Sequence, residues 1–254
     1  KNYFDHLLTI LPFEPSYFQR VGLASKFIGH PVLEYGVQEA DGRVFRKDHG
    51  IDSDQKLICI LPGSRRGEVT RHLSIFGEAL ARYRAAWGDV FAVIPTVPAI
   101  RAFVEEGVSG WPKPPIIVST PLEKYQSMKA SNLALAASGT VALETALAEV
   151  PTVIAYKVSP LTAFIVRRLI KVNYVNIINV LAGKEIVPEC LQEKCSPDVL
   201  ADILGEFSTV SGQSQIQQVR PYLSQLASSE GRPSEVAAQY IIKVSTPETP
   251  VDLP

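Results

Sequence analysis

The sequence predicts an α/β protein with a Rossmann-like parallel sheet, and three observations support this fold class. Short apolar segments alternate with segments of helical periodicity between residues 57 and 156. The segment Leu133–Ala136 is continuously apolar, as expected for a strand buried on both faces. The 254 residues, 46% of them hydrophobic and 20% charged, have a globular composition and suffice for one large domain or parts of two.

Four segments divide the chain. Residues 1–37 are too few to fold alone, and we expect them to be the end of a preceding N-terminal domain. The stretch 38–55 is rich in charge and poor in apolar residues, which predicts a linker. Residues 56–206 are expected to form the Rossmann-like domain, and residues 207–254 C-terminal helices and a tail.

The elements can be justified in order from their apolar patterns. In the first segment we expect a strand within 1–11, a short helix over 15–20 and a strand over 26–28. Strands of the main sheet are predicted at Leu57–Leu61, Val90–Ile94, Ile116–Val118, Leu133–Ala136 and Thr152–Tyr156. Helices are predicted at Glu68–Arg84, Ala99–Glu106, Leu122–Ala130, from Thr140 or Val141 to Leu147, and over 160–171, 197–206 and 213–244.

The turn after Leu133–Ala136 is the first candidate site. It brings Ser138, Gly139 and Thr140 to the start of a helix, where free N–H groups and the helix dipole favour a phosphate. One turn further on, Glu144 could accept hydrogen bonds from both hydroxyls of a ribose. An ordinary strand–turn–helix with a capping hydroxyl and a solvated glutamate explains this stretch about equally well.

The loop after Leu57–Leu61 is the second candidate site, and it lies at the same carboxyl edge of a parallel sheet. Gly63 and Ser64 permit close backbone approach, while Arg65 and Arg66 offer guanidinium groups to phosphate oxygens. The loop lacks the Gly-Lys-Ser/Thr of a P-loop and the G-x-G-x-x-G of a dinucleotide site. No G-x-S-x-G motif supplies a hydrolase nucleophile.

Charge and cysteine content limit the function classes. The net charge of −1 gives no indication of nucleic-acid binding. Three cysteines form no disulfide framework, and four scattered histidines make a metal site improbable.

The predicted 160–171 helix is amphipathic and basic, so it could lie on an anionic membrane surface through Phe164, Arg167, Arg168 and Lys171. A core-facing helix with a solvated edge is an equal alternative.

Six sequence blocks together resemble one family, the lipid-A-disaccharide synthases of bacterial lipopolysaccharide assembly. The blocks, in the order of that family, are LPFEPSYF (11–18), FIGHPV (27–32), LPGSRRGEV (61–69), LALAASGTVALETAL (133–147), YKVSPLT (156–162) and NVLAGKEIVPECLQE (179–193). The resemblance implies a GT-B fold, of which this chain holds the C-terminal half. It further implies a metal- and cofactor-independent inverting transfer from UDP-2,3-diacylglucosamine to lipid X, at the inner face of the bacterial inner membrane, with a homodimer left open.

The resemblance also implies roles for individual residues. Donor contacts are expected from Gly63, Ser64, Arg65, Ser138, Gly139, Thr140, Glu144, Asn179, Glu189 and Gln192. The general base of the family is an aspartate in a Pro-Asp-Phe-Asn-like motif of the N-terminal domain, and this motif is absent from the sequence. We therefore expect the chain alone to be inactive. A UDP-sugar 2-epimerase and a non-catalytic UDP-sugar-binding module are the alternatives.

Overall fold

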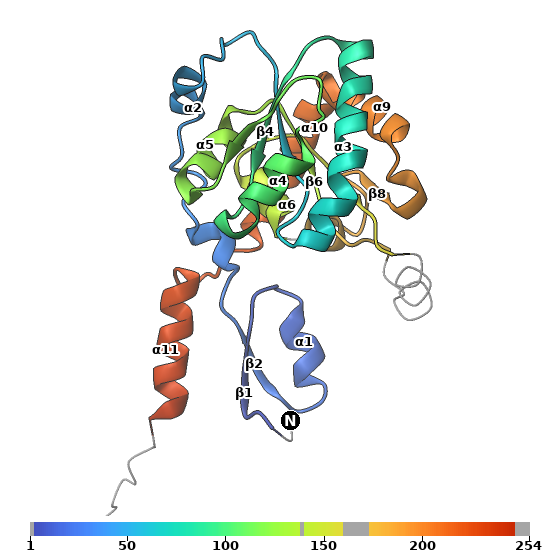
Figure 1. The fold of residues 1–254 in the computed structure, drawn as a ribbon. Coiled ribbons are helices and arrows are strands. Elements are labelled where there is room, and N and C mark those ends of the chain that lie inside the picture. Colours follow the sequence, from blue (N-terminus) through green and yellow to red (C-terminus); the bar gives the residue numbers. More distant parts are fainter. Residues whose placement is uncertain (1–2, 138–139, 160–172, 247–254) are drawn as a thin grey trace, which may run out of the picture. The chain divides into compact units, whose positions relative to one another are not determined.

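The structure is a computed structural model that describes residues 3–137, 140–159 and 173–246. It divides into two compact units (Figure 1). The terminal unit comprises Lys1–Tyr35 and Leu223–Pro254, and the central unit comprises Gly36–Tyr222. The chain therefore passes from one unit to the other twice.

A six-stranded sheet forms the middle of the central unit. Its strands are β3 (Leu57–Leu61), β4 (Phe91–Pro95), β5 (Ile116–Val118), β6 (Leu133–Ala136), β7 (Thr152–Tyr156) and β8 (Glu189–Leu191). They lie in the order β5-β4-β3-β6-β7-β8, and every pairing is parallel. The strand order reverses between β3 and β6, which is where open α/β sheets bind their ligands.

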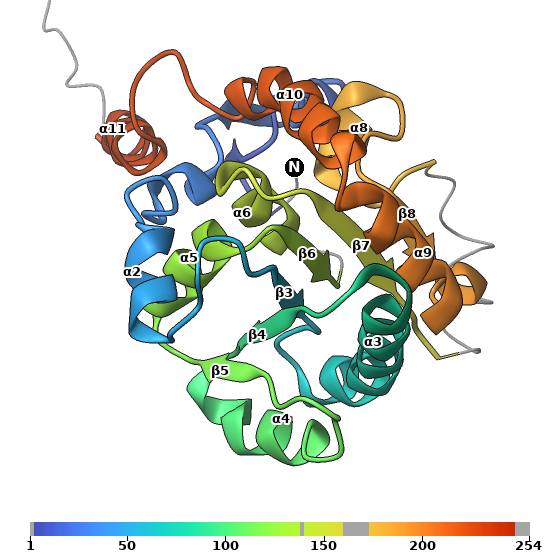
Figure 2. The ribbon, with the colours of Figure 1, turned by 90° about the horizontal axis from the view of Figure 1, so that it is seen from above.

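Helices cover both faces of this sheet (Figure 2). One face carries α3 (Arg66–Trp87), α4 (Arg101–Gly107) and α9 (Pro197–Phe207). The other face carries α5 (Pro121–Ala130), α6 (Val141–Leu147) and α10 (Val210–Ser224), with α8 (Ile177–Ala182) beside α6. Short 3-10 helices η2 (Pro98–Ile100) and η3 (Gln192–Lys194) complete the unit. The predicted α/β fold with a Rossmann-like parallel sheet is confirmed.

The core explains why the strands have continuous apolar sequences. All residues of β3 and β6 are buried. Because side chains alternate along a strand, Ile58 and Ile60 join a cluster that includes Phe76 and Tyr83 of α3, while intervening residues face the opposite helices. A strand with helices on both faces has no side exposed to water, so it needs no polar residue.

The segment predicted as a linker, 38–55, contains α2 (Gly42–Asp48) and belongs to the central unit. Phe45 is buried, and a Cβ atom at Gly42 would lie 2.5 Å from the backbone of Ala130, so α2 packs closely on α5. Arg46 donates to backbone carbonyls of Ala130, Asp52 and Gln55. One aromatic side chain and one arginine thus anchor a helix whose composition is otherwise polar.

The terminal unit joins the two ends of the chain. Strands β1 (His6–Thr9) and β2 (Ala24–Phe27) pair in parallel beside α1 (Glu14–Gln19), with η1 (Pro31–Glu34) following. Helix α11 (Pro233–Ser245) contacts η1, where Glu34 accepts hydrogen bonds from the amide and hydroxyl of Ser234. The predicted helix over 213–244 is therefore two helices, because residues 225–232 between α10 and α11 form a turn.

Candidate functional site

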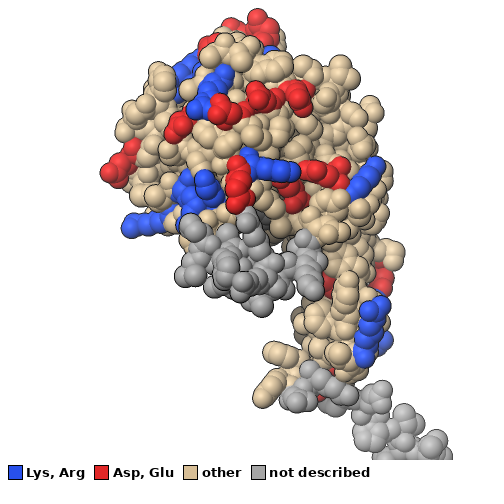
Figure 3. All heavy atoms as spheres, turned by 90° about the vertical axis from the view of Figure 1, so that its right-hand side faces the viewer, with Lys and Arg blue, Asp and Glu red and all other residues tan. Residues whose placement is uncertain are grey.

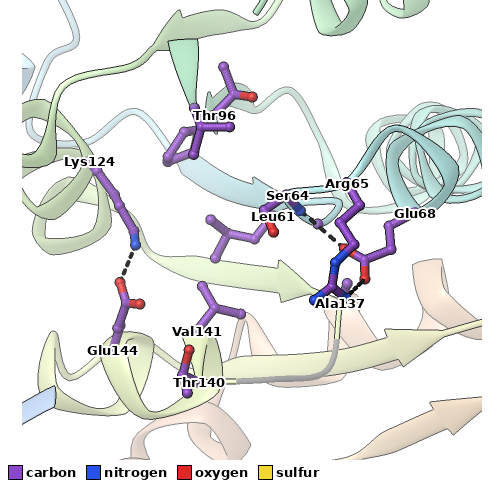
Figure 4. Close-up of a pocket in the computed structure, with 13 residues that line it drawn as sticks. Leu61, Ser64, Arg65, Glu68, Thr96, Lys124, Ala137, Thr140, Val141 and Glu144 are labelled. Carbon is purple, nitrogen blue, oxygen red and sulfur yellow. Dashed lines mark hydrogen bonds and ion pairs between the residues drawn. The ribbon is translucent and has the colours of Figure 1, made fainter. Parts of the chain in front are cut away.

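A cavity of about 410 Å³ opens at the carboxyl ends of β3, β4 and β6 (Figure 4). Its lining comes from the β3–α3 loop, the residues after β4, helix α5 and the start of α6. The site arises from the register of the sheet: Leu61 pairs with Ala136, so the loops that follow β3 and β6 begin side by side. The topology therefore places both sequence-predicted loops at one cavity.

The β3–α3 loop forms the first wall. Gly63 has a φ of +117°, and a Cβ atom there would lie 2.6 Å from the Cβ of Glu68, so the position requires glycine. The Ser64 amide donates to Glu68 Oε2 over 3.1 Å, and Glu68 Oε1 lies 3.1 Å from Arg65 Nη1. The Arg65 side chain is 83% exposed. Glu68 thus occupies donors that an anionic ligand would also use.

The opposite wall contains a buried ion pair between two helices. Glu144 of α6 faces Lys124 of α5, and the two side chains form an ion pair across the cavity wall (Figure 4). The Glu144 side chain is only 6% exposed, and that of Lys124 is 31% exposed. A carboxylate so deeply buried needs a counter-ion to remain charged, and Lys124 provides one.

Two threonines complete the polar lining. Thr140, the N-cap residue of α6, makes no side-chain capping bond and is exposed. The hydroxyl of Thr96, the residue after β4, is buried and has no hydrogen-bond partner among the described residues. Both residues line the cavity, and the exposed Thr140 is open to a ligand.

His72 of α3 supports the first wall from behind. Its Nδ1 lies 2.9 Å from the carbonyl oxygen of Pro62, and its Nε2 accepts from the amide of Lys157 over 3.1 Å. The ring stacks on Phe76 and contacts Tyr156. Burial lowers the pKa of His72, so the neutral imidazole connects the β3–α3 loop to the end of β7.

Asn179, Glu189 and Gln192 do not line this cavity. The Asn179 amide donates to the Val187 carbonyl and to Glu189, and its oxygen accepts from the amides of Ile186 and Val187. Glu189 also accepts from two backbone amides. These bonds tie α8 to β8, so the geometry gives Asn179 a supporting position; its role as a donor contact stays a prediction.

Several predicted residues lie outside the described part of the chain, namely Ser138, Gly139, Phe164, Arg167, Arg168 and Lys171. Conversely, sequence reasoning missed Glu68, Thr96 and Lys124 as parts of the cavity. Glu68 could have been found, because an acidic residue three positions into a helix commonly reaches back to the preceding loop. Lys124 carries no such signal, since its position depends on how α5 packs beside α6.

Two further kinds of functional feature, a metal-binding cluster and a membrane-spanning helix, are absent from the described residues. Within them no three histidine, cysteine or acidic side chains gather as a metal site would require. No described helix combines the length and apolar character needed to cross a membrane. On the face that carries α3 and α9, acidic and basic side chains are interspersed where described residues form the surface (Figure 3). Burial raises the pKa of the Cys190 thiol to about 12 and that of Cys195 to about 11.

Solved structures show the class to which this fold belongs. The chain superposes on the S. aureus MnaA-UDP co-structure with a TM-score of 0.57 and 14% identity, covering 98% of this chain and 64% of that one. It matches WaaG, a glycosyltransferase involved in lipopolysaccharide biosynthesis, with a TM-score of 0.51 and 19% identity, covering 80% and 51%. The fold is that of the Rossmann-like, C-terminal half of a GT-B glycosyltransferase.

Sequence comparisons then identify the family. The model of the lipid-A-disaccharide synthetase family matches residues 1–242. A lipid-A-disaccharide synthase of Rhodospirillum centenum is 45% identical over 96% of this chain and 61% of its own length; that of Paramagnetospirillum magneticum is 40% identical over 94% and 62%. The chain belongs to the lipid-A-disaccharide synthetase family, which confirms the resemblance. It spans about 60% of the length of these relatives.

Proposed function

We propose that this chain provides the donor-binding part of a lipid-A-disaccharide synthase. The proposed enzyme condenses UDP-2,3-diacylglucosamine with 2,3-diacylglucosamine 1-phosphate (lipid X), and the products are the disaccharide 1-phosphate and UDP. The observation that supports this role most strongly is the cavity at the switch point of the sheet. Exposed Arg65 lies on one side of it and buried Glu144 on the other.

The two walls suit different parts of a nucleoside diphosphate. The guanidinium of Arg65 and the amides at the start of α3 suit the diphosphate, because both are donors to phosphate oxygens. The carboxylate of Glu144 suits the two ribose hydroxyls, since a carboxylate only accepts hydrogen bonds. We therefore place the diphosphate at the β3–α3 loop and the nucleoside toward Glu144 and Thr96.

The proposed chemistry is an inverting displacement. The acceptor hydroxyl attacks the anomeric carbon, a general base takes its proton, and the bond to the diphosphate breaks so that UDP leaves with the electron pair. Arg65 and the α3 N-terminus would stabilise the charge that develops on the leaving group. We expect the base to belong to the part of the family's length that this chain does not span.

Calorimetry with UDP and UMP tests the binding site. UDP should bind more tightly than UMP, because only UDP has a second phosphate for Arg65. R65A should weaken UDP more than UMP. E144A should weaken both ligands by about 1–3 kcal/mol, since it removes hydrogen bonds to a charged group. R82A, at a distant position on α3, is the matched control. Unchanged UDP affinity in both R65A and E144A would mean that the site is misplaced.

A turnover assay tests the activity. The chain is incubated with UDP-2,3-diacylglucosamine and lipid X, and disaccharide and UDP are followed by mass spectrometry. We expect background rates, because a general base contributes about 10²–10⁴-fold. Fusing the upstream domain of a relative should restore turnover. Robust turnover by the chain alone would place the base within it, with Asp5, Glu14 and Glu34 as the first candidates.

Association with an anionic membrane surface is a separate part of the proposal. It rests on the basic amphipathic sequence of residues 160–171, which lies outside the described residues. Each basic residue near such a surface contributes about 1 kcal/mol, and salt screens the attraction. Co-sedimentation with anionic vesicles should fall with salt and in R167E/R168E. Equal binding to neutral and anionic vesicles would contradict the electrostatic contribution.

A further inference from the structure

We propose that Lys124 is a positioning residue for ribose recognition: it holds the carboxylate of Glu144 so that the free carboxylate positions face the ribose hydroxyls of a nucleoside diphosphate. The inference rests on the proposed function, because it takes the cavity to be the nucleotide site. It assigns a role to a residue that no motif of the sequence marks. The observation behind it is the ion pair between α5 and α6 at the wall of the cavity.

The burial of the pair is asymmetric. Glu144 is almost fully buried, whereas about a third of the Lys124 side chain is exposed. Burying a carboxylate costs several kcal/mol unless a counter-ion compensates. Among the described residues, the ion pair with Lys124 is the one recorded for Glu144. Lys124 therefore supplies the positive charge that compensates the buried carboxylate of Glu144.

The carboxylate keeps unused capacity after pairing. A carboxylate has two oxygens and about four positions for hydrogen bonds. Lys124 contacts Oε2, which is itself buried, and no hydrogen bond from a described side chain or amide is seen at Oε1. Glu144 lines the cavity, so the hydrogen-bonding capacity of Oε1 is left for a ligand. Two neighbouring hydroxyls, as on a ribose, match two such positions on one carboxylate.

Lys124 should therefore act through Glu144 on ribose selectivity. A buried acceptor built for a hydroxyl rejects an analogue without it, because the acceptor is then left unpaired. Hydrogen bonds to a charged acceptor are roughly twice as strong as those to a neutral one. Without the ammonium, the carboxylate loses both its fixed direction and its counter-ion. Discrimination between ribose and 2′-deoxyribose should then decrease.

A direct contact of Lys124 with phosphate makes a different prediction. In that case a Lys124 variant would bind pyrophosphate more weakly and would keep its preference for ribose. We infer the indirect role because the ammonium lies against Glu144, while the β3–α3 loop has its own cation in Arg65. Pyrophosphate is therefore included as a probe without a ribose.

The experiment measures the affinities of the full chain for UDP, 2′-deoxy-UDP and pyrophosphate by calorimetry. The variants are K124M, K124R, E144Q and the double variant K124M/E144Q, with K129M as the matched control on the same helix. The wild type should prefer UDP over 2′-deoxy-UDP by about tenfold, the value of one hydrogen bond to a charged group. K124M should reduce that preference to about twofold, while K124R and K129M keep it. Pyrophosphate affinity should be unchanged throughout.

The outcomes separate this inference from the proposed function. If the wild type does not bind UDP, the proposed function fails. If it binds UDP but K124M keeps the tenfold preference, or loses pyrophosphate affinity instead, the role of Lys124 is overturned. The double variant should show no further loss relative to E144Q, because Lys124 acts only through Glu144. Should K124M unfold by circular dichroism, K124Q replaces it in the same series and is judged by the same ratio.

Discussion

Two groups of polar side chains in the central unit, one around Asn179 and one around Glu144, differ in how their hydrogen-bonding capacity is used. At Asn179 and Glu189, the protein itself fills every position of the Asn179 amide and several of the Glu189 carboxylate. At Glu144, the protein supplies an ion pair with Lys124, and the carboxylate faces a cavity. A saturated polar cluster stabilises the fold, whereas an unsaturated one beside a cavity is available to a ligand.

The largest expected effect is on stability. N179A should lower the free energy of unfolding by about 3–5 kcal/mol, because several buried partners are left unpaired and each costs about 1–3 kcal/mol. Urea denaturation measures the loss, and N173A at an exposed position is the control. The UDP affinity of the folded protein should be unchanged. A stable N179A protein with weakened UDP binding would mean that Asn179 serves the ligand rather than the fold.

The complementary change is E144Q. It should lower UDP affinity by about 1–2 kcal/mol, because a charged acceptor is replaced by a neutral amide whose hydrogen bonds are roughly half as strong. The free energy of unfolding should change little, since Lys124 is partly exposed and can be solvated. Calorimetry and urea denaturation of the same samples check both statements. A large loss of stability with normal UDP binding would make Glu144 a scaffold residue like Asn179.

A smaller effect of opposite sign is expected at the other wall of the cavity. Glu68 accepts from the Ser64 amide and pairs with Arg65, where we place the diphosphate. E68Q keeps an acceptor for the Ser64 amide and removes a negative charge, so UDP affinity should rise two- to fivefold, about 0.5–1 kcal/mol. E78Q, on the same helix, is the control. Weaker UDP binding in E68Q would instead make Glu68 a support for Arg65.

The smallest effect concerns pH. Burial lowers the pKa of His72 below its usual 6.5, so between the two values the unfolded chain binds more protons than the folded one. Stability is therefore complete above about pH 6.5 and decreases as the pH falls toward the folded-state pKa. H72Q should flatten this dependence between pH 7.5 and 5.5 in urea denaturation. The pKa of His30 is also lowered by burial, so part of the slope should persist. If the free energy of unfolding depends on pH equally in H72Q and in the wild type, His72 is not a source of that pH dependence.

The sheet could be predicted well because burial on both faces leaves a direct mark on the sequence. Strands β3, β5, β6 and β7 begin and end at the predicted residues. Strand β8 was missed because its sequence, Glu-Cys-Leu, begins with a charged residue and lacks the continuous apolar run of the equally short edge strand β5. Helix α2 was missed because it is fixed by the burial of Phe45 and by packing on α5, which includes the bond from Arg46 to Ala130, 84 residues away.

The site could be predicted only as far as topology determines it. Parallel strands align their carboxyl ends, so the convergence of the loops after β3 and β6 follows from strand order alone. The partners of individual side chains depend on how neighbouring helices are rotated. For this reason Lys124 was missed and the saturation of Asn179 could not be foreseen.

The two crossings of the chain between its units have a consequence for synthesis on the ribosome. In the terminal unit, His6 bonds to Tyr240 and Glu34 to Ser234, across 234 and 200 residues. The central unit ends at Tyr222, before α11 is made. It can therefore fold while residues 3–35, already made, still lack their partner helix. Residues 3–35 therefore reach their native contacts late, and until α11 emerges they expose the surface that this helix will cover.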